Sequence, residues 1–145
     1  MTALSLPSSS RTCSSSWLGL AQSTAELLLR RVLRSRYIPH RPTTKQAAFL
    51  ALTEREALYG GAAGGGKSDA LLMAALMFAD VPGYAAILFR RTFADLALPQ
   101  ALMARAHEWL QGTDAHWNER DKTWTFPVLS LVYFPMPRLG IAQPP

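Results

Sequence analysis

The sequence predicts an α/β fold, in which a mostly parallel sheet carries helices on its faces. Two observations lead to this prediction. Short apolar runs alternate with amphipathic segments in the order strand, helix, strand, helix, strand. A burst of glycines between residues 60 and 66 separates the first apolar run from the first of these helices. At 145 residues, the chain has the length of one domain with a core of its own.

The first 42 residues are predicted to lie outside this fold. Residues 1–23 are rich in serine and contain no Asp or Glu, which is typical of a disordered tail. Residues 24–42 are expected to form a basic helix and a linker, because Pro39 and Pro42 end the helical pattern. The arginines are interpreted as a solvated helix face and linker, with a DNA groove as the alternative: Arg30, Arg31, Arg34, Arg36 and Arg41.

The strand and helix pattern occupies residues 43–127. Thr43 or Thr44 is expected to cap a short helix that runs to Leu52. Buried strands are expected at 57–59 and 84–89, helices at 68–80 and 99–110, and an edge or half-buried strand at 123–126. The tail at 128–145 is proline-rich and contains no acidic residue, so we expect that it does not continue the fold.

The glycine-rich stretch at residues 61–68 reads Gly-Ala-Ala-Gly-Gly-Gly-Lys-Ser and matches the pattern G-x-x-x-x-G-K-S/T at each fixed position. Glycines suit such a loop because phosphate oxygens must approach several backbone N–H groups at once. The next helix would direct its free N–H groups and the positive end of its dipole at the same phosphates. The predicted phosphate-binding residues are Gly61, Ala62, Ala63, Gly64, Gly65, Gly66, Lys67 and Ser68.

Two of these side chains have expected chemical roles. Lys67 would reach the β- and γ-phosphates of ATP, and the Ser68 hydroxyl would bind Mg²⁺. The alternative is a glycine-rich turn in which the lysine and the serine are incidental. The position of the stretch between an expected strand and an expected helix favours the phosphate loop.

Three residues outside the loop are further candidates. Gln46 lies one short helix upstream, and its amide can both donate to and accept from the N6/N7 edge of adenine. Arg90 and Arg91 follow the second expected strand, and ligands of open α/β sheets bind beyond the carboxyl ends of strands. An arginine there can approach a phosphate or a DNA strand. The alternative for all three residues is a solvated side chain.

Composition limits the other classes of function. The formal charge of +5 favours polyanionic partners, although many basic proteins bind no nucleic acid. Cys13 is the single cysteine, which excludes an internal disulfide and a multi-cysteine metal site. No apolar run approaches the roughly 20 residues of a membrane span, so no membrane partner is expected.

Four blocks in order make residues 37–127 resemble the N-terminal ATPase domain of phage terminase large subunits. They lie at residues 37–46, 56–73, 90–96 and 122–127. The resemblance implies an ATPase of the additional-strand, helicase-like division of P-loop NTPases, with ATP and Mg²⁺ as cofactors. It assigns adenine recognition to Gln46, phosphate binding to residues 61–68, and catalytic roles to Lys67 and Arg91.

The resemblance also implies a biological setting. Intact terminases pump double-stranded DNA into a procapsid as a ring of subunits, with a portal protein and a terminase small subunit as partners. The implied location is the cytoplasm of the bacterial host.

The sequence departs from the family after Pro127. The family places there an apolar strand that ends in Asp-Glu, followed later by a nuclease domain, whereas this chain has no acidic residue beyond Asp121. We therefore expect an incomplete ATPase domain over residues 43–127, truncated and frameshifted after Pro127, with little or no ATP hydrolysis. The alternatives are a non-functional prophage gene remnant and a fragment of another P-loop enzyme such as a helicase.

Overall fold

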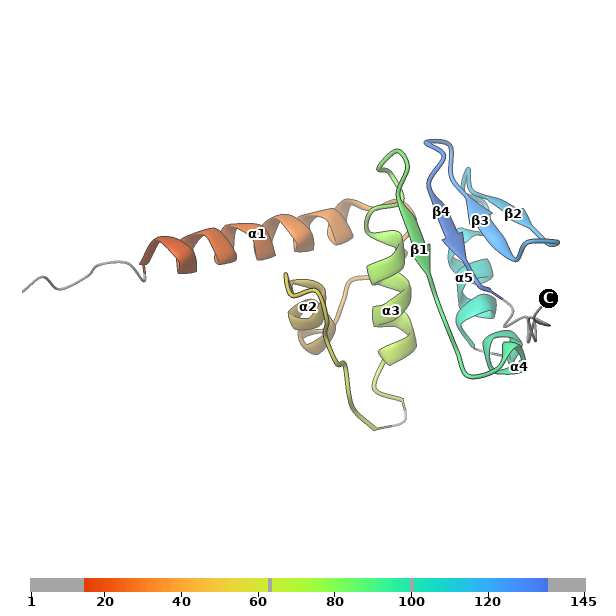
Figure 1. Cartoon of the computed structure of the whole chain (residues 1–145), viewed down its shortest axis with the longest axis horizontal. Coiled ribbons are helices and arrows are strands. Elements are labelled where there is room, and N and C mark those ends of the chain that lie inside the picture. Colours follow the sequence, from red (N-terminus) through yellow and green to blue (C-terminus); the bar gives the residue numbers. More distant parts are fainter. Residues whose placement is uncertain (1–14, 63, 100, 136–145) are drawn as a thin grey trace, which may run out of the picture.

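The computed structural model describes residues 15–62, 64–99 and 101–135, without the side chains of residues 15–23 and 93. Five helices and a four-stranded sheet lie in this part of the chain (Figure 1). The helices are α1 (Ser15–Arg34), α2 (Thr44–Leu50), α3 (Lys67–Leu76), α4 (Phe93–Ala97) and α5 (Leu102–Leu110). The strands are β1 (Ala85–Ile87), β2 (His116–Asn118), β3 (Thr123–Thr125) and β4 (Leu131–Tyr133).

The sheet is mixed, with the strand order β1-β4-β3-β2. β1 and β4 are parallel, whereas β4 and β3, and β3 and β2, are antiparallel. The fold is thus α/β with flanking helices, but the prediction of a mostly parallel sheet is wrong. The physical reason is the tight turn at residues 126–130, which reverses the chain after β3 and makes β4 its antiparallel neighbour.

The segment after Pro127 does continue the fold, which corrects a second expectation. β4 lies between β1 and β3, and Val132 and Phe134 are buried in the core. The buried Ser130 hydroxyl donates a hydrogen bond to the carbonyl of Ala79. The prolines do not prevent this, because Pro127 and Pro135 flank the strand and leave its own N–H groups intact.

The apolar run at residues 57–59 is not a strand, which corrects a third expectation. Residues 56–60 have no regular secondary structure, and Leu58 is 98% exposed. The second predicted range does contain a strand, at residues 85–87, but the expectation that it is buried is wrong, because it lies at the edge of the described sheet and Ile87 is 53% exposed. The strand expected at 123–126 lies inside the sheet, because β2, which was not predicted, forms the edge beside it.

The helix predictions agree better with the structure. Thr43, one of the two expected capping residues, caps α2. α3 falls within the range predicted after the glycines apart from its first residue, and α5 occupies most of the range 99–110. α4 was not predicted. Residues 15–23 belong to α1, which corrects the expected disorder of that segment, since no proline interrupts the chain between Ser15 and Pro39. The rest of both predicted tails, 1–14 and 136–145, lies outside the described residues.

The core is formed where α3 and α5 pack together and against the sheet. In Figure 1, α3 runs alongside β1, and α5 lies behind β3 and β4. The largest fully buried side chains of these elements, and of the residues directly after β3 and β4, are Leu72, Met73, Leu76, Leu102, Leu110, Phe126, Val132 and Phe134. This packing fixes the direction of α3 and therefore the position of the glycine-rich loop at its N-terminus. No helix in the described ranges combines the length and the apolar character needed to cross a membrane.

Candidate phosphate-binding site

The loop before α3 owes its shape to its glycines. Gly64 and Gly66 have φ of 78° and 68°, in the left-handed region that side chains other than glycine rarely adopt. Gly66 is the N-cap of α3, and no side chain caps the helix there. The first N–H groups of α3 are therefore left for another acceptor. Ala63, one of the predicted loop residues, lies outside the described residues.

A cavity of about 400 Å³ opens on this loop. It is lined by Gly64, Gly65, Gly66, Lys67, Ser68, Asp69 and Arg105. The cavity thus contains the uncapped start of a ten-residue helix together with two cationic side chains. Backbone N–H groups, the helix dipole and positive charge all favour an anion.

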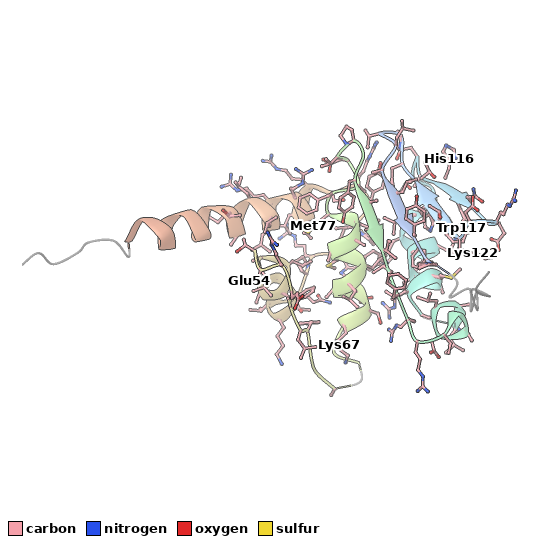
Figure 2. All side chains as sticks on the ribbon, viewed as in Figure 1. Glu54, Lys67, Met77, His116, Trp117 and Lys122 are labelled. Atoms are coloured by element: carbon pink, nitrogen blue, oxygen red, sulfur yellow. The ribbon has the colours of Figure 1, made fainter. Side chains whose placement is uncertain are left out.

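The Lys67 side chain folds back over the loop. Its ammonium donates hydrogen bonds to the carbonyl oxygens of Gly61, at 2.8 Å, and Ala62, at 2.5 Å. Figure 2 shows Lys67 at the loop end of α3. The Lys67 ammonium is thus already hydrogen-bonded within its own loop. A bound phosphate would compete with these carbonyl oxygens for the lysine.

Ser68 is contacted from the segment that follows β1. The Arg90 guanidinium donates to the Ser68 hydroxyl oxygen at 3.2 Å. The sequence indicated Arg90 and Arg91 as candidates, and in the structure Arg90 contacts the loop. Arg91, which was predicted to be catalytic together with Lys67, is exposed in the same segment.

Gln46 reaches the loop from α2, but its amide is engaged within the protein. Its Oε1 accepts from the N–H of Thr43 at 2.8 Å, which completes the N-terminal cap of α2. Its Nε2 donates to the Gly66 carbonyl at 2.9 Å. Gln46 is only 3% exposed, so an adenine could use its amide only after these two bonds opened. In this structure Gln46 ties α2 to the loop.

Asp69 and Arg105 form an ion pair at the cavity that the sequence did not indicate. Arg105 Nη1 lies 2.5 Å from Asp69 Oδ1, and the two side chains are 35% and 17% exposed. Arg105 belongs to α5, whose neighbouring residues Leu102 and Ala106 are buried in the core. No local pattern could have revealed this pair, because 36 residues separate its members.

The arginines near the end of α1 lie at the opposite end of α3. Arg31 donates to the Met77 carbonyl at 3.3 Å and to Asp80 at 2.6 Å, and Arg36 pairs with Asp114 at 2.7 Å. A cavity of about 570 Å³ lies between α1 and this end of α3. Arg31 and Arg36 therefore attach α1 and the linker to the body of the protein, rather than forming only a solvated face.

Among the described residues, the cavity offers only a few side-chain oxygen atoms as ligands for a metal ion. Over the described ranges, no three His, Cys, Asp or Glu side chains come together as a metal-binding group. The Ser68 hydroxyl remains the candidate ligand for Mg²⁺. A single hydroxyl ligand agrees with the usual coordination of nucleotide-bound Mg²⁺, which takes one or two protein ligands and completes its shell with phosphates and water.

Comparison of the chain with protein-family models, with curated proteins and with solved structures gives no match. The class that the fold defines is a small mixed α/β protein with a four-stranded sheet and flanking helices. Any function assigned to the cavity therefore depends on its own residues and geometry.

Proposed function

We propose that residues 61–68 bind the phosphates of ATP together with Mg²⁺. The observation that carries this proposal is the placement of the Lys67 ammonium over a loop whose left-handed Gly66 leaves the start of α3 uncapped. An anion in the cavity would face backbone N–H groups, the positive end of a helix and a lysine together. A glycine-rich turn without a ligand has no need of this combination.

The glycines, Lys67 and Ser68 have different roles in this proposal. The glycine N–H groups would surround the β-phosphate, and Lys67 would leave the carbonyls of Gly61 and Ala62 to reach the phosphate oxygens. Ser68 would exchange its contact with Arg90 for Mg²⁺. Bound Mg²⁺ would neutralise phosphate charge. Binding is the function that these residues support.

The wider proposal is that the chain is the ATP-binding part of a terminase large subunit. In that setting it would belong to a motor of the P-loop NTPase class that packages double-stranded viral DNA in the cytoplasm of the bacterial host, with a portal protein and a small subunit as partners. Its support comes from the order of the four sequence blocks. Three of these blocks contribute side chains near the loop: Gln46, Lys67 and Arg90.

Hydrolysis is expected to be weak or absent in this proposal. A water molecule needs a general base, which commonly contributes about 10²–10⁴ in rate. Asp69 is the acidic residue that lines the cavity, and its carboxylate is paired with Arg105. The Asp69 carboxylate is already bonded to the Arg105 guanidinium at 2.5 Å, so it could orient a water molecule only after this ion pair rearranged.

Thermal unfolding tests the binding proposal. Ligand at about 100 times its Kd stabilises a protein by about 2.7 kcal/mol, so Mg·ATP should raise the melting temperature by several degrees. Lys67→Ala should abolish the rise. Lys45→Ala, which removes an exposed lysine from α2, should retain it. An unchanged melting temperature for the parent chain would contradict the proposal, and aggregation on expression would favour a gene remnant.

A further inference from the structure

Arg105 occupies an unusual position in the phosphate cavity. Every other described residue that lines it belongs to the loop or to the first turn of α3, whereas Arg105 comes from α5. We propose that Arg105 is a phosphate-contacting residue that makes the site select long phosphate chains. The proposal rests on the function proposed above and extends it to a residue outside the P-loop motif.

The first argument is the way in which Arg105 is held. Its backbone N–H bonds to the Ala101 carbonyl in the first turn of α5, and the adjacent Ala106 is fully buried. α5 in turn packs on α3. The backbone of Arg105 is therefore anchored on the core. The packing of α5 on α3, rather than a mobile segment, sets the distance between the guanidinium and the loop.

The second argument is the partner of Arg105. Asp69 Oδ1 lies 2.5 Å from Arg105 Nη1, so the carboxylate holds the guanidinium at the cavity wall. Asp69 is also in the first turn of α3, directly after Ser68. An arginine held in this way is pre-oriented, and the donors of a planar guanidinium suit the oxygen atoms of both carboxylates and phosphates.

The third argument is the charge of the cavity wall. Lys67 and Arg105 contribute two positive charges and Asp69 one negative charge, which leaves a net charge of +1 among the described side chains that line the cavity. Lys67 is next to the carbonyls of Gly61 and Ala62, at the start of the loop, whereas Arg105 is next to Asp69, beyond its end. Because both cations line the same cavity, the larger negative charge of a phosphate chain matches them better than that of a single phosphate.

The affinities of AMP, ADP and ATP, measured with Mg²⁺ by calorimetry on the full chain, test this inference. Arg105→Ala should weaken ATP binding about tenfold to a hundredfold, the range of a lost charge-assisted hydrogen bond, and should leave AMP almost unchanged. Arg105→Lys should restore part of the ATP affinity. Arg120→Ala, which removes an exposed arginine from the β2–β3 turn, is the matched control and should bind all three nucleotides like the parent.

A second variant separates phosphate binding from a structural role. Asp69→Asn removes the ion pair but keeps the guanidinium, so it should still prefer ATP to AMP. If the ion pair only holds α5 to α3, Arg105→Ala and Asp69→Asn should both weaken the binding of AMP, ADP and ATP by equal factors. That result would overturn the inference. An Arg105→Ala variant that binds ATP like the parent would also overturn it. A parent chain that binds no nucleotide would instead refute the proposed function, and the inference with it.

Discussion

Gly66 links the local conformation of the loop to two neighbouring elements. Its φ of 68° directs the chain from the loop into α3, and its carbonyl accepts a hydrogen bond from Gln46 on α2. A Cβ atom built on Gly66 would lie 2.6 Å from Gln46 Nε2. The same glycine thus provides a left-handed backbone and the space for a buried amide, so the motif glycine is also a packing position.

A substitution at Gly66 should therefore destabilise the protein even without nucleotide. Gly66→Ala forces a side chain into the left-handed region and against Gln46, and should lower the free energy of unfolding by about 1–3 kcal/mol. Urea denaturation measures this change. Gly60→Ala is the control, because its Cβ meets nothing within 4 Å, and it should stay within about 0.5 kcal/mol. Equal losses in both variants would argue against the packing role.

At the scale of elements, α5 is joined to the β2–β3 hairpin by a cluster of rings. The His107 ring centroid lies 4.5 Å from that of Trp117 on β2 and 5.1 Å from that of Trp124 on β3. Burial lowers the pKa of His107, the nearby Lys122 lowers it further, and Glu119 opposes both effects. The imidazole is therefore favoured in its neutral form where α5 meets the hairpin.

The lowered pKa of His107 predicts a loss of stability in mild acid. Below about pH 6.5 the unfolded chain takes up a proton on this histidine before the folded chain does, so the free energy of unfolding falls as the pH decreases toward the folded pKa. His107→Phe should flatten this slope, which is at most about 1.4 kcal/mol per pH unit for one proton. His116→Gln, which changes an exposed histidine on β2, should keep it. Denaturation curves between pH 5 and 8 measure the difference.

At the scale of the whole molecule, β4 joins the two halves of the sheet. It pairs with β1 on one side and with β3 on the other. Its neighbours Ser130 and Phe134 are fully buried, and the Ser130 hydroxyl bonds to the end of the α3 region at Ala79. The segment after Pro127 thus connects α3, β1 and the hairpin in one core.

Deletion of residues 128–145 should therefore abolish cooperative unfolding. It removes β4, leaves β1 without the strand beside it in the described sheet, and exposes the core around Phe126 and Leu72. Deletion of residues 136–145 alone should retain a sigmoidal thermal transition, since β4 ends at Tyr133. Circular dichroism melts of the two deletions make the comparison. A cooperative transition in the longer deletion would contradict the role assigned to β4.

The sequence alone determined the features that depend on neighbouring residues. The Thr43 cap of α2, the loop glycines and the start of the next helix follow from local chemistry, because caps and left-handed glycines depend on a few adjacent atoms. The exposure of residue 58 and the strand at 131–133 could not be read in this way. A three-residue apolar run is compatible with a strand or a coil until its neighbours are known.

Only the tertiary structure decided which distant residues meet at the cavity. The sequence indicated Lys67 and Ser68 through the spacing of the motif, but Arg105 reaches Asp69 because α5 packs on α3. Gln46 was recognised as a candidate, yet its two hydrogen bonds to Thr43 and Gly66 appear only when α2 is placed against the loop. The spacing of a motif reflects the chemistry of one short segment. Which residues far apart in the sequence come into contact depends on how the helices pack over the sheet.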